Sequence, residues 1–474
     1  MKNHLLIVCF VGICTSLQSQ SLPKHKQAII QSVEAHQASL IRMSDSIWTW
    51  AEIAFEEHKS SALLADFAEK QGFRVTRELA EMPTAFIAEY GAGKPILGIL
   101  GEFDALPNIS QKAVPHKDPL QTGAGGHACG HNLFGVGSMG AALAIKELME
   151  KGKINGTLRF YGTPAEEKFF GKLYFARAGL FDDLDVCLDW HPSATTHTDM
   201  QSTQALIDFE VEFHGLSAHA GMDPWNGRSA LDGLEFYTNG LNYLREHIRP
   251  SARIHYQILH GGDVANVVPD YAKLWTRLRE SDRDYLDKVY ARAKEIAEGA
   301  SMMAGVTHKI TLIAGLHEVL VNRRGGEILQ KNLELLGPIT YTEEEIAFAK
   351  SIQASLNYTQ SGMDGSIQPL APTLKDPLGY SSDVGDVSWL VPEIRLGVTT
   401  APIGTPWHSW PVVACGGMSI GHKGMLFAAK ALGITLVDLF QDPTLVAEIR
   451  KEFEEKRGDF SYEAIVPEGP PPIE

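Results

Sequence analysis

Three short apolar runs end in polar clusters, and this feature constrains the fold of the chain most strongly. Residues 95–100 lead into Glu102 and Asp104, residues 157–161 into Glu166 and Glu167, and residues 184–190 into His191. Helical patterns cover 24–72 and recur between the runs, for example at 133–150. Short apolar strands that alternate with helices are typical of an α/β fold with a mostly parallel sheet, and such sheets gather their functional side chains at the carboxyl ends of the strands. We therefore expect the polar clusters to meet at one edge of a sheet.

A different pattern, strand–helix–strand–strand–helix–strand, occupies residues 204–315. The expected strands are 205–213, 253–259, 272–279 and 306–313, and the expected helices are 228–248 and 284–304. This order predicts a ferredoxin-like βαββαβ sandwich. The α/β pattern then resumes near Leu320 and ends with a strand around 394–400. We therefore predict a discontinuous catalytic domain of 21–203 and 316–467, an inserted α+β lid or dimerisation domain of 204–315, and a flexible tail of 468–474.

The first 20 residues have the pattern of a secretory signal peptide. Lys2 is followed by the apolar run 5–14 and then by small or polar residues. The apolar run is too short to span a membrane. We therefore expect an exported protein, periplasmic or secreted, that is free of the membrane after cleavage; a cytosolic protein with an apolar amino-terminal strand is the alternative. Cleavage leaves Cys129, Cys187 and Cys415, and an odd set without a CxxC pair does not suit a disulfide framework.

Charge and composition narrow the class of partners. The 474 residues include 42 Lys and Arg against 58 Asp and Glu, and the net charge of −16 argues against nucleic acids and anionic membranes as partners. With 44% hydrophobic and 21% charged residues, the chain has the composition of a globular protein, and it is long enough to bury a large core without disulfides or metals. These properties favour an enzyme.

The stretch 126–132, Gly-His-Ala-Cys-Gly-His-Asn, is the most informative for chemistry. Cys129 and His131 lie two residues apart on a glycine-rich loop before a helix, where the helix dipole favours a thiolate. A buried structural cysteine beside a surface histidine is the alternative for this stretch alone. Of the adjacent carboxylates Glu166 and Glu167, one can bind a metal while the other accepts a proton from water, although paired glutamates are more often a solvated surface feature.

Two kinds of catalytic site fit these residues. One is a cysteine hydrolase built on Cys129, with His131 as its base. The other is a metal site, which we favour, because a thiol, several imidazoles including that of His191 and a pair of carboxylates form a typical set of metal ligands. The sequence contains neither an H-E-x-x-H motif nor a P-loop.

Nine motifs occur along the chain in a characteristic order. The first five are Gly101–Pro107, His127–His131, Pro164–Glu167, His191–Pro192 and Gly215–Ala220. The last four are Ala265–Pro269, Ser381–Trp389, Pro406–Trp410 and Ser419–Met425. Together they resemble peptidase family M20, the aminoacylase and carboxypeptidase family of metallopeptidases, and in particular its amidohydrolase branch. The later motifs are similar to those of the p-aminobenzoyl-glutamate hydrolase subgroup.

The resemblance implies a hydrolase with two divalent metal ions in each subunit. The implied ligands are Cys129, His131, Glu167, His191 and His408. Glu166 would act as the general base, and Asp104 would orient a ligand. Mixed sulfur, nitrogen and oxygen donors suit Zn²⁺, and Mn²⁺ and Co²⁺ also occur in this family. Glu102 stands where other branches have a ligand histidine, and we do not assign it to the metal. Asn132 stands where many members of the branch have aspartate.

The resemblance also implies a homodimer that forms through the inserted domain. His219 of one protomer would then reach the active site of the other and stabilise the oxyanion, and Asn266 would help to bind the substrate. The alternative for His219 is a buried histidine at the end of a strand.

We therefore expect a metal-dependent amidohydrolase that cleaves the amide bond of an N-acyl or N-aroyl amino acid, such as p-aminobenzoyl-glutamate, with a metal-activated water. A dipeptidase or a general aminoacylase is the alternative among enzymes. A binding protein that kept the fold without catalysis is the alternative of another class. The presence of Glu166 argues against that alternative, because metal binding alone does not require this residue.

Overall fold

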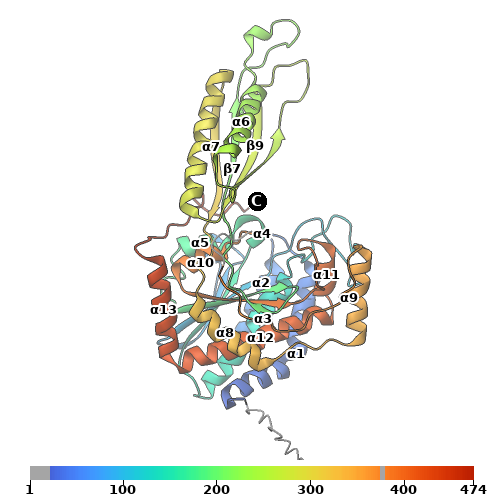
Figure 1. Cartoon of the computed structure of the whole chain (residues 1–474), viewed down its shortest axis with the longest axis vertical. Coiled ribbons are helices and arrows are strands. Elements are labelled where there is room, and N and C mark those ends of the chain that lie inside the picture. The colour runs from blue at the N-terminus through green and yellow to red at the C-terminus, as the bar shows by residue number, and fades with distance from the viewer. Residues whose placement is uncertain (1–21, 374–378, 474) are drawn as a thin grey trace, which may run out of the picture.

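The computed structural model describes residues 22–373 and 379–473. The expected signal peptide of 1–20 lies outside the described residues. Figure 1 shows a large unit and a smaller unit, drawn in green and yellow, that projects from it. The smaller unit is an insertion, because the chain leaves the large unit after β6 (His197–Thr198) and returns to it after β10 (Thr307–Leu316).

The large unit is built on a sheet with the strand order β1-β2-β4-β3-β5-β11-β6. Besides β6, its strands are β1 (Arg74–Arg77), β2 (Phe86–Ala92), β3 (Ile96–Glu102), β4 (Gly156–Thr163), β5 (Val186–Ser193) and β11 (Glu393–Thr399). The central strands β4, β3, β5 and β11 are parallel, whereas β1, β2 and β6 pair antiparallel with their neighbours. The parallel centre confirms the predicted α/β class, and the antiparallel edges are an addition that the pattern did not predict.

Helices cover the sheet of the large unit. They are α1 (Lys24–Trp50), α2 (His58–Lys70), α3 (His131–Glu150), α4 (Glu166–Phe169), α5 (Gly171–Arg177), α8 (Arg323–Leu336), α9 (Glu343–Ser355), α10 (Val384–Leu390), α11 (Trp410–Gly416), α12 (Ser419–Gln441) and α13 (Pro443–Arg457). α3 and α12 pack on each other and on the sheet, and α1 packs on both. α12 is long and apolar enough to cross a membrane, but 78% of its most apolar window is buried inside the protein. It is therefore a core helix of the large unit.

The helical pattern of 24–72 forms two helices, because the chain turns sharply at Ala51. Ala51 adopts a left-handed conformation with a φ of 43°, and its N–H donates to the carbonyl oxygen of Ile47. The carboxylate of Glu52 then accepts hydrogen bonds from the backbone N–H groups of Lys59 (3.1 Å) and Ser60 (2.9 Å). The first N–H groups of a helix have no partner within the helix. Glu52 therefore stabilises the start of α2.

The inserted unit has a four-stranded antiparallel sheet with the order β10-β7-β9-β8. Its other elements are β7 (Ala205–His214), α6 (Ala230–Leu244), β8 (Arg253–His260), β9 (Tyr271–Glu280) and α7 (Arg283–Ala304). This order confirms the predicted ferredoxin-like topology. Buried and partly exposed residues alternate along β9, so that Ala272, Leu274 and Leu278 enter a core that the inserted unit forms by itself.

The carboxyl-terminal segment packs where the inserted unit joins the large unit. The N–H of Gly315, in β10, donates to the carbonyl oxygen of Ile465 at 2.7 Å. The guanidinium of Arg177, in α5, donates to the carbonyl oxygens of Pro467 and Gly469. The segment thus connects the last strand of the inserted unit to a helix of the large unit, and the first residues of the predicted tail 468–474 take part in this connection.

Candidate metal centre

The carboxyl ends of the parallel strands meet at one edge of the sheet. β3 ends at Glu102, which is paired in register with Thr163 at the end of β4. After β4 the chain reverses at Ala165, whose φ is 61°, and α4 begins with Glu166 and Glu167. The predicted convergence of polar clusters is therefore found in the structure, and the reversal at Ala165 places the two glutamates at this edge.

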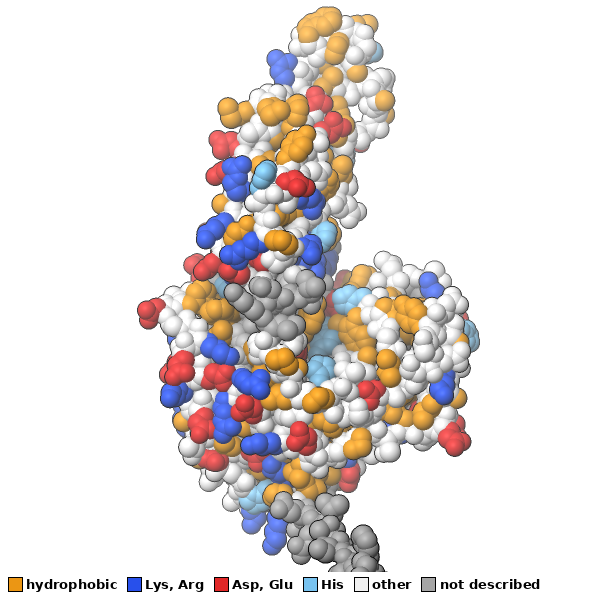
Figure 2. All heavy atoms as spheres, viewed as in Figure 1, with side chains coloured by type: hydrophobic (Ala, Val, Ile, Leu, Met, Phe, Trp, Pro, Cys, Tyr) orange, Lys and Arg blue, Asp and Glu red, His pale blue; other side chains and the backbone are white. Residues whose placement is uncertain are grey.

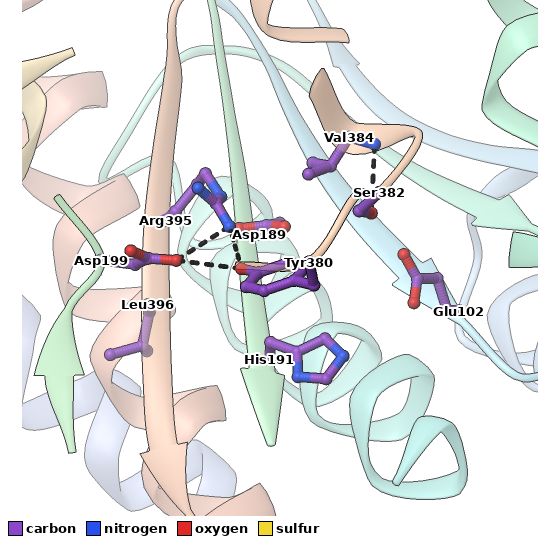
Figure 3. A pocket seen from close by; sticks show the side chains of 9 residues that line it. All are labelled: Glu102, Asp189, His191, Asp199, Tyr380, Ser382, Val384, Arg395 and Leu396. Atoms are coloured by element: carbon purple, nitrogen blue, oxygen red, sulfur yellow. Dashed lines mark hydrogen bonds and ion pairs between the residues drawn. The ribbon is translucent and has the colours of Figure 1, made fainter. Parts of the chain in front are cut away.

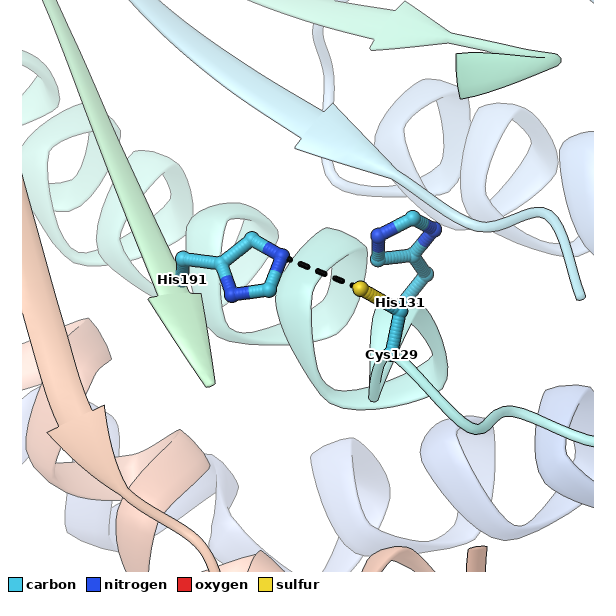
Figure 4. A group of neighbouring side chains, drawn as sticks. All are labelled: Cys129, His131 and His191. Atoms are coloured by element: carbon cyan, nitrogen blue, oxygen red, sulfur yellow. Dashed lines mark hydrogen bonds between the residues drawn. The ribbon is translucent and has the colours of Figure 1, made fainter. Parts of the chain in front are cut away.

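Cys129, His131 and His191 form a first group of possible metal ligands (Figure 4). Their donor atoms lie within 4.8 Å of one another, and Cys129 Sγ is 3.4 Å from His191 Nε2. Gly130, with a φ of 82°, allows the chain to turn between Cys129 and His131, and a Cβ atom there would lie 2.8 Å from Pro192. His191 Nδ1 is 2.8 Å from its nearest acceptor, the carbonyl oxygen of Pro192. The proton of the neutral ring therefore lies on Nδ1, and Nε2 has a free lone pair.

Cys129 belongs to a second group together with Glu167 and His408. His408 Nε2 lies 3.4 Å from Glu167 Oε2. The N–H of His408 donates to the carbonyl oxygen of Ala128 at 3.1 Å, which joins the loop before α11 to the loop that carries Cys129. The side chain of His408 is 55% exposed, so this side of the centre is open to solvent. Figure 2 shows histidine side chains, in pale blue, in the hollow between the two units.

Asp104 holds two members of these groups in place. Its Oδ1 atom is 2.9 Å from Nδ1 of His131, and its Oδ2 atom accepts a hydrogen bond of 2.9 Å from the backbone N–H of Glu167. A carboxylate behind a ligand histidine fixes the ring orientation and leaves Nε2 for the metal. Asp104 therefore lies where a residue that orients His131 must lie.

Lys172 is a residue of this region that the sequence analysis missed. Its ammonium group is fully buried, 2.5 Å from Glu102 Oε1 and 2.7 Å from Asp383 Oδ1. Glu102 Oε2 in turn lies 2.9 Å from His131 Nε2, and Glu102, His131 and Glu166 form a third group of neighbouring donor atoms. The signal for Lys172 was a lone lysine in the otherwise apolar stretch 171–176, which a surface helix also explains.

Asn132 has a structural role that explains an amide at this position. Its side-chain amide group donates hydrogen bonds to Ser44 Oγ at 3.0 Å and to the carbonyl oxygen of Gly416 at 3.1 Å. A carboxylate has no N–H to donate to that carbonyl. Asn132 thus joins α3 to α1 and α11.

Burial and crowding shift the protonation of the side chains at this edge. Burial, together with the charge of His131, lowers the pKa of His191 to about 4. Burial raises the pKa of Glu167 to about 7. Burial also raises the pKa of Glu166 well above its usual value, and the neighbouring carboxylates of Glu102 and Asp383 raise it further. The imidazole of His191 is therefore neutral and suited to bind a metal.

The residues present fit two divalent cations. Glu167 Oε1 is buried and has no hydrogen-bond partner among the described residues, and His131 Nε2 faces the carboxylate of Glu102 at 2.9 Å. Thiolate, imidazole and carboxylate donors form a typical ligand set for Zn²⁺ and related ions. The carboxyl groups gathered in this region are those of Glu102, Asp104, Glu166, Glu167 and Asp383. The positive charges of Lys172 and His131 are fewer than these carboxyl groups, whereas two bound divalent cations would balance them.

A small cavity lies behind His191 (Figure 3). Arg395, from β11, projects into it, donates to the hydroxyl of Tyr380 at 2.6 Å and forms an ion pair with Asp199 at 2.8 Å. Asp189 lines the same cavity. Because the charge of Arg395 is already matched by the carboxylate of Asp199, this arginine supports the framework around His191 and is not free to bind a substrate carboxylate.

His219 and Asn266 do not lie at the metal centre of their own chain. They belong to the loops after β7 and after β8, at the end of the inserted unit that is farthest from the large unit (Figure 1). Both residues are exposed, so the alternative of a buried strand-end histidine is wrong for His219. The structure brings the two loops together, because His219 pairs with Val267 and the N–H of Ala220 donates to the carbonyl oxygen of Asn266.

Comparison with known proteins places this centre in a family. Residues 202–301 match the M20 peptidase dimerisation domain. The chain is 36% identical over 471 residues to a p-aminobenzoyl-glutamate hydrolase subunit of Escherichia coli, a match that covers 94% of this chain and 98% of that protein. It is 28% identical over 473 residues to human Xaa-Arg dipeptidase, covering 94% and 95% of the two chains.

Solved structures share the fold. The Bacillus subtilis dinuclear metal-binding peptidase of the M20 family superimposes with a TM-score of 0.57 at 18% sequence identity, over 86% of this chain and 99% of that one. An aminobenzoyl-glutamate utilization protein from Klebsiella pneumoniae gives the same TM-score at 16% identity, over 83% and 97% of the two chains. Given this shared fold and an identity of 36% over nearly the whole length of one relative, the chain belongs to peptidase family M20 and is a metal-dependent hydrolase of amide bonds.

Proposed function

We propose that this protein hydrolyses N-aroyl amino acids in which the amino acid is acidic, with p-aminobenzoyl-glutamate as the leading candidate. The similarity to the p-aminobenzoyl-glutamate hydrolase subunit of Escherichia coli over almost the full chain supports this substrate class. An indole-3-acetyl-aspartic acid hydrolase of Enterobacter agglomerans, 27% identical over 243 residues, also carries an aromatic acyl group and an acidic amino acid in the name of its substrate.

The proposed metal ligands are Cys129, His131, Glu167, His191 and His408. When bound, two divalent cations supply polarisation of the amide carbonyl and lower the pKa of a water molecule. Zn²⁺ is our first candidate because of the thiolate donor, with Mn²⁺ and Co²⁺ as alternatives. Asp104 keeps the His131 ring in the orientation required for binding through Nε2, since its carboxylate lies 2.9 Å from Nδ1.

Glu166 is the proposed general base, and its position carries the proposal. Its carboxylate is within 4.8 Å of the donor atoms of His131 and Glu102, and it precedes the proposed ligand Glu167 directly. A carboxylate beside the metal ligands can accept a proton from the attacking water and then pass it to the nitrogen of the leaving amine as the C–N bond breaks. A protein that only binds metal or substrate has no use for a second carboxylate at this place.

His219 is the proposed hydrogen-bond donor to the oxyanion, and it would act in the neighbouring protomer. Nδ1 of His219 accepts hydrogen bonds of 3.1 Å from the N–H groups of Gly221 and Met222, so the proton of the neutral ring must be on Nε2. The ten residues of β7, at about 3.3 Å each, separate this loop from its own large unit by roughly 30 Å. A partner protomer is therefore the natural site of action. Asn266, on the adjoining loop, is the proposed contact to substrate.

We propose a homodimer formed through the inserted unit, in a protein that is exported after removal of residues 1–20. The match to the dimerisation domain supports association. A different polypeptide is the alternative partner, because the relatives include a second p-aminobenzoyl-glutamate hydrolase subunit from Escherichia coli, 28% identical over 236 residues. Light scattering of the purified chain distinguishes the two, since a lone monomer would contradict the homodimer.

A panel of amides tests the substrate. The metal-supplemented enzyme is assayed with p-aminobenzoyl-glutamate, indole-3-acetyl-aspartate, N-acetylglutamate and a dipeptide with carboxyl-terminal arginine. We expect the highest kcat/KM for the two aromatic acyl substrates. Preference for the dipeptide would instead support the second candidate, a dipeptidase, which the similarity to human Xaa-Arg dipeptidase favours.

A further inference from the structure

The loops at the end of the inserted unit expose an unusual number of large apolar side chains. On the loop after β7, Met222 and Trp225 are each 72% exposed and Leu216 is also exposed; on the loop after β8, so are Val264 and Val267. Figure 2 shows several hydrophobic side chains, in orange, at the surface of this end of the molecule. Contiguous exposed apolar surface on a water-soluble domain marks a place that another molecule covers.

The loop after β7 is held in one conformation by its own hydrogen bonds. Ser217 Oγ donates to Asp270 Oδ2 at 2.8 Å, and Asn226 Nδ2 donates to Asp223 Oδ2 at 3.1 Å. A short 3₁₀ helix at Pro224–Asn226 carries Trp225. The exposure of Met222 and Trp225 is therefore a fixed feature of the loop and does not come from a disordered segment.

The same loop carries His219, and the apolar side chains are close to it along the chain. The N–H of Met222 donates both to Nδ1 and to the carbonyl oxygen of His219, so Met222 follows His219 within one turn. The N–H of Asp223 donates to the carbonyl oxygen of His219 at 3.1 Å, and the 3₁₀ helix with Trp225 starts at the next residue. If His219 contacts the carbonyl group of the substrate, Met222 and Trp225 then lie close to the same substrate molecule.

We infer that Met222 and Trp225 form an apolar wall over the active site of the partner protomer and select substrates with a bulky aromatic acyl group. This inference rests on the proposed function. An N-acyl amino acid has a charged half, which ends in a carboxylate, and an acyl half that can be wholly apolar. A thioether and an indole favour the apolar half, because burial of aromatic surface is favourable and burial of an unpaired carboxylate is not. The part of the substrate that this wall contacts is thus the acyl group.

Replacement of Trp225 tests the selectivity. We expect Trp225→Ala to lower kcat/KM for p-aminobenzoyl-glutamate by about tenfold or more, with little change for N-acetylglutamate. Met222→Ala should act in the same direction with a smaller effect. Tyr243→Ala is the matched control, because Tyr243 is an aromatic residue of similar exposure, 73%, at the other end of the inserted unit on α6. We expect the control variant to keep the wild-type kcat/KM for both substrates.

Mixing of protomers tests whether the wall acts across the dimer. Trp225→Ala, which keeps Glu166, is mixed with Glu166→Gln, which keeps Trp225, under conditions in which protomers exchange. In a mixed dimer, the active site that has Glu166 then receives a loop with Trp225 from its partner. We expect the preference for the aromatic substrate to rise toward that of the wild type on mixing. An unchanged preference on mixing would overturn the action in trans.

Three further outcomes separate this inference from the proposed function. If the wild type prefers the aromatic substrate and Trp225→Ala lowers kcat/KM equally for both substrates, or for neither, the inference of an apolar wall is wrong. The proposed function then stands. If Trp225→Ala abolishes the dimer in sedimentation and lowers kcat/KM equally for both substrates, the exposed apolar side chains of these loops form a dimer interface only. If the wild type itself shows no preference for the aromatic acyl group, the proposed substrate class fails and the inference fails with it.

Discussion

At the scale of single residues, Glu166 and Glu167 are neighbours in sequence with different surroundings. Glu167 contacts Asp104 through its backbone N–H and lies near His408, so it belongs to a group of donor atoms that includes Cys129. Glu166 lies in a different group, near His131 and Glu102. Glu166 and Glu167 are successive residues of the short helix α4, which starts after the left-handed residue Ala165, so their side chains point in different directions. The same pair of residues can therefore supply one ligand and one base.

Conservative replacement of each glutamate should separate these roles. We expect Glu166→Gln to keep the metal content and to lower kcat by roughly 10²–10⁴, the usual contribution of a positioned general base. We expect Glu167→Gln to lower the metal content, measured by atomic emission, because a neutral amide is a poor replacement for a carboxylate ligand. Equal loss of metal from both variants would show that our division of roles is wrong.

Lys172 should contribute to stability through its two buried ion pairs. Lys172→Met leaves the carboxylates of Glu102 and Asp383 without their shared cation, and removal of one partner from a buried pair typically costs about 3–5 kcal/mol. The measurement is the free energy of unfolding in denaturant. Lys168→Met is the matched control, because Lys168 is an exposed lysine four residues earlier on α4. A loss of similar size in both variants would contradict this role of Lys172.

At the scale of elements, the carboxyl-terminal segment joins the two units of the chain. Ile465 pairs with Gly315 of β10, and Val466 packs on a small apolar cluster between the units. That cluster consists of Phe170, Leu173, Leu206, Ala314 and Leu316. The hydroxyl of Tyr462 also donates to Asp386 Oδ1 at 2.9 Å. These contacts fall where the chain returns from the inserted unit to the large unit.

Truncation after Gly458 should therefore destabilise the connection between the inserted unit and the large unit. We expect faster cleavage within 314–322 in limited proteolysis, because the truncation uncovers the apolar cluster and removes the pairing with β10. A chain truncated after Gly469, which keeps Tyr462, Ile465 and Val466, is the control and should resist cleavage like the full chain. Equal cleavage of both truncated chains would contradict a role for residues 459–469.

At the scale of the whole molecule, the active site that we propose is completed by a second protomer. The metal centre lies at the edge of the large sheet, whereas His219 lies at the far end of the inserted unit. The large unit has a core of its own, and so does the inserted unit. Each unit can therefore keep its structure while the two sets of residues come together only between protomers.

Complementation between two inactive variants should show this arrangement. His219→Ala and Glu166→Gln are each expected to lower kcat, the former by about 10²–10³, the usual effect of losing one oxyanion donor. In a mixed dimer, one site has both wild-type residues if His219 acts in trans, so mixing with exchange of protomers should restore activity. If His219 acts within its own chain, every site carries a lesion and mixing restores nothing.

Removal of the metal should abolish activity without unfolding the protein. The large core does not depend on the cations, so we expect the chelated protein to keep a cooperative unfolding transition, measured by circular dichroism. Titration of thiols in denaturant should count three in the chain that lacks residues 1–20, since Cys129, Cys187 and Cys415 are all free. A lower count, or a chelated protein without a transition, would contradict a metal-held Cys129 in a stable fold.

The sequence by itself determined the features that depend on neighbouring residues. The alternation of β9, the βαββαβ order and the polar clusters after β3, β4 and β5 all follow from local periodicity, so they could be predicted without a structure. The convergence of Asp104, Glu167 and His191 also followed, because parallel strands end at a common edge. His408 and His219 came from the resemblance to a family and not from spacing.

Only the tertiary structure decided the contacts between distant segments. Lys172 meets Glu102 and Asp383 across 70 and 211 residues of chain, and no pattern within any of these segments reveals the pairing. The antiparallel edges of the large sheet likewise depend on which strands lie beside β1, β2 and β6 in the packed chain. Local propensity is set by a few adjacent residues, whereas burial and charge pairing depend on the whole packed chain, which is why these features required the structure.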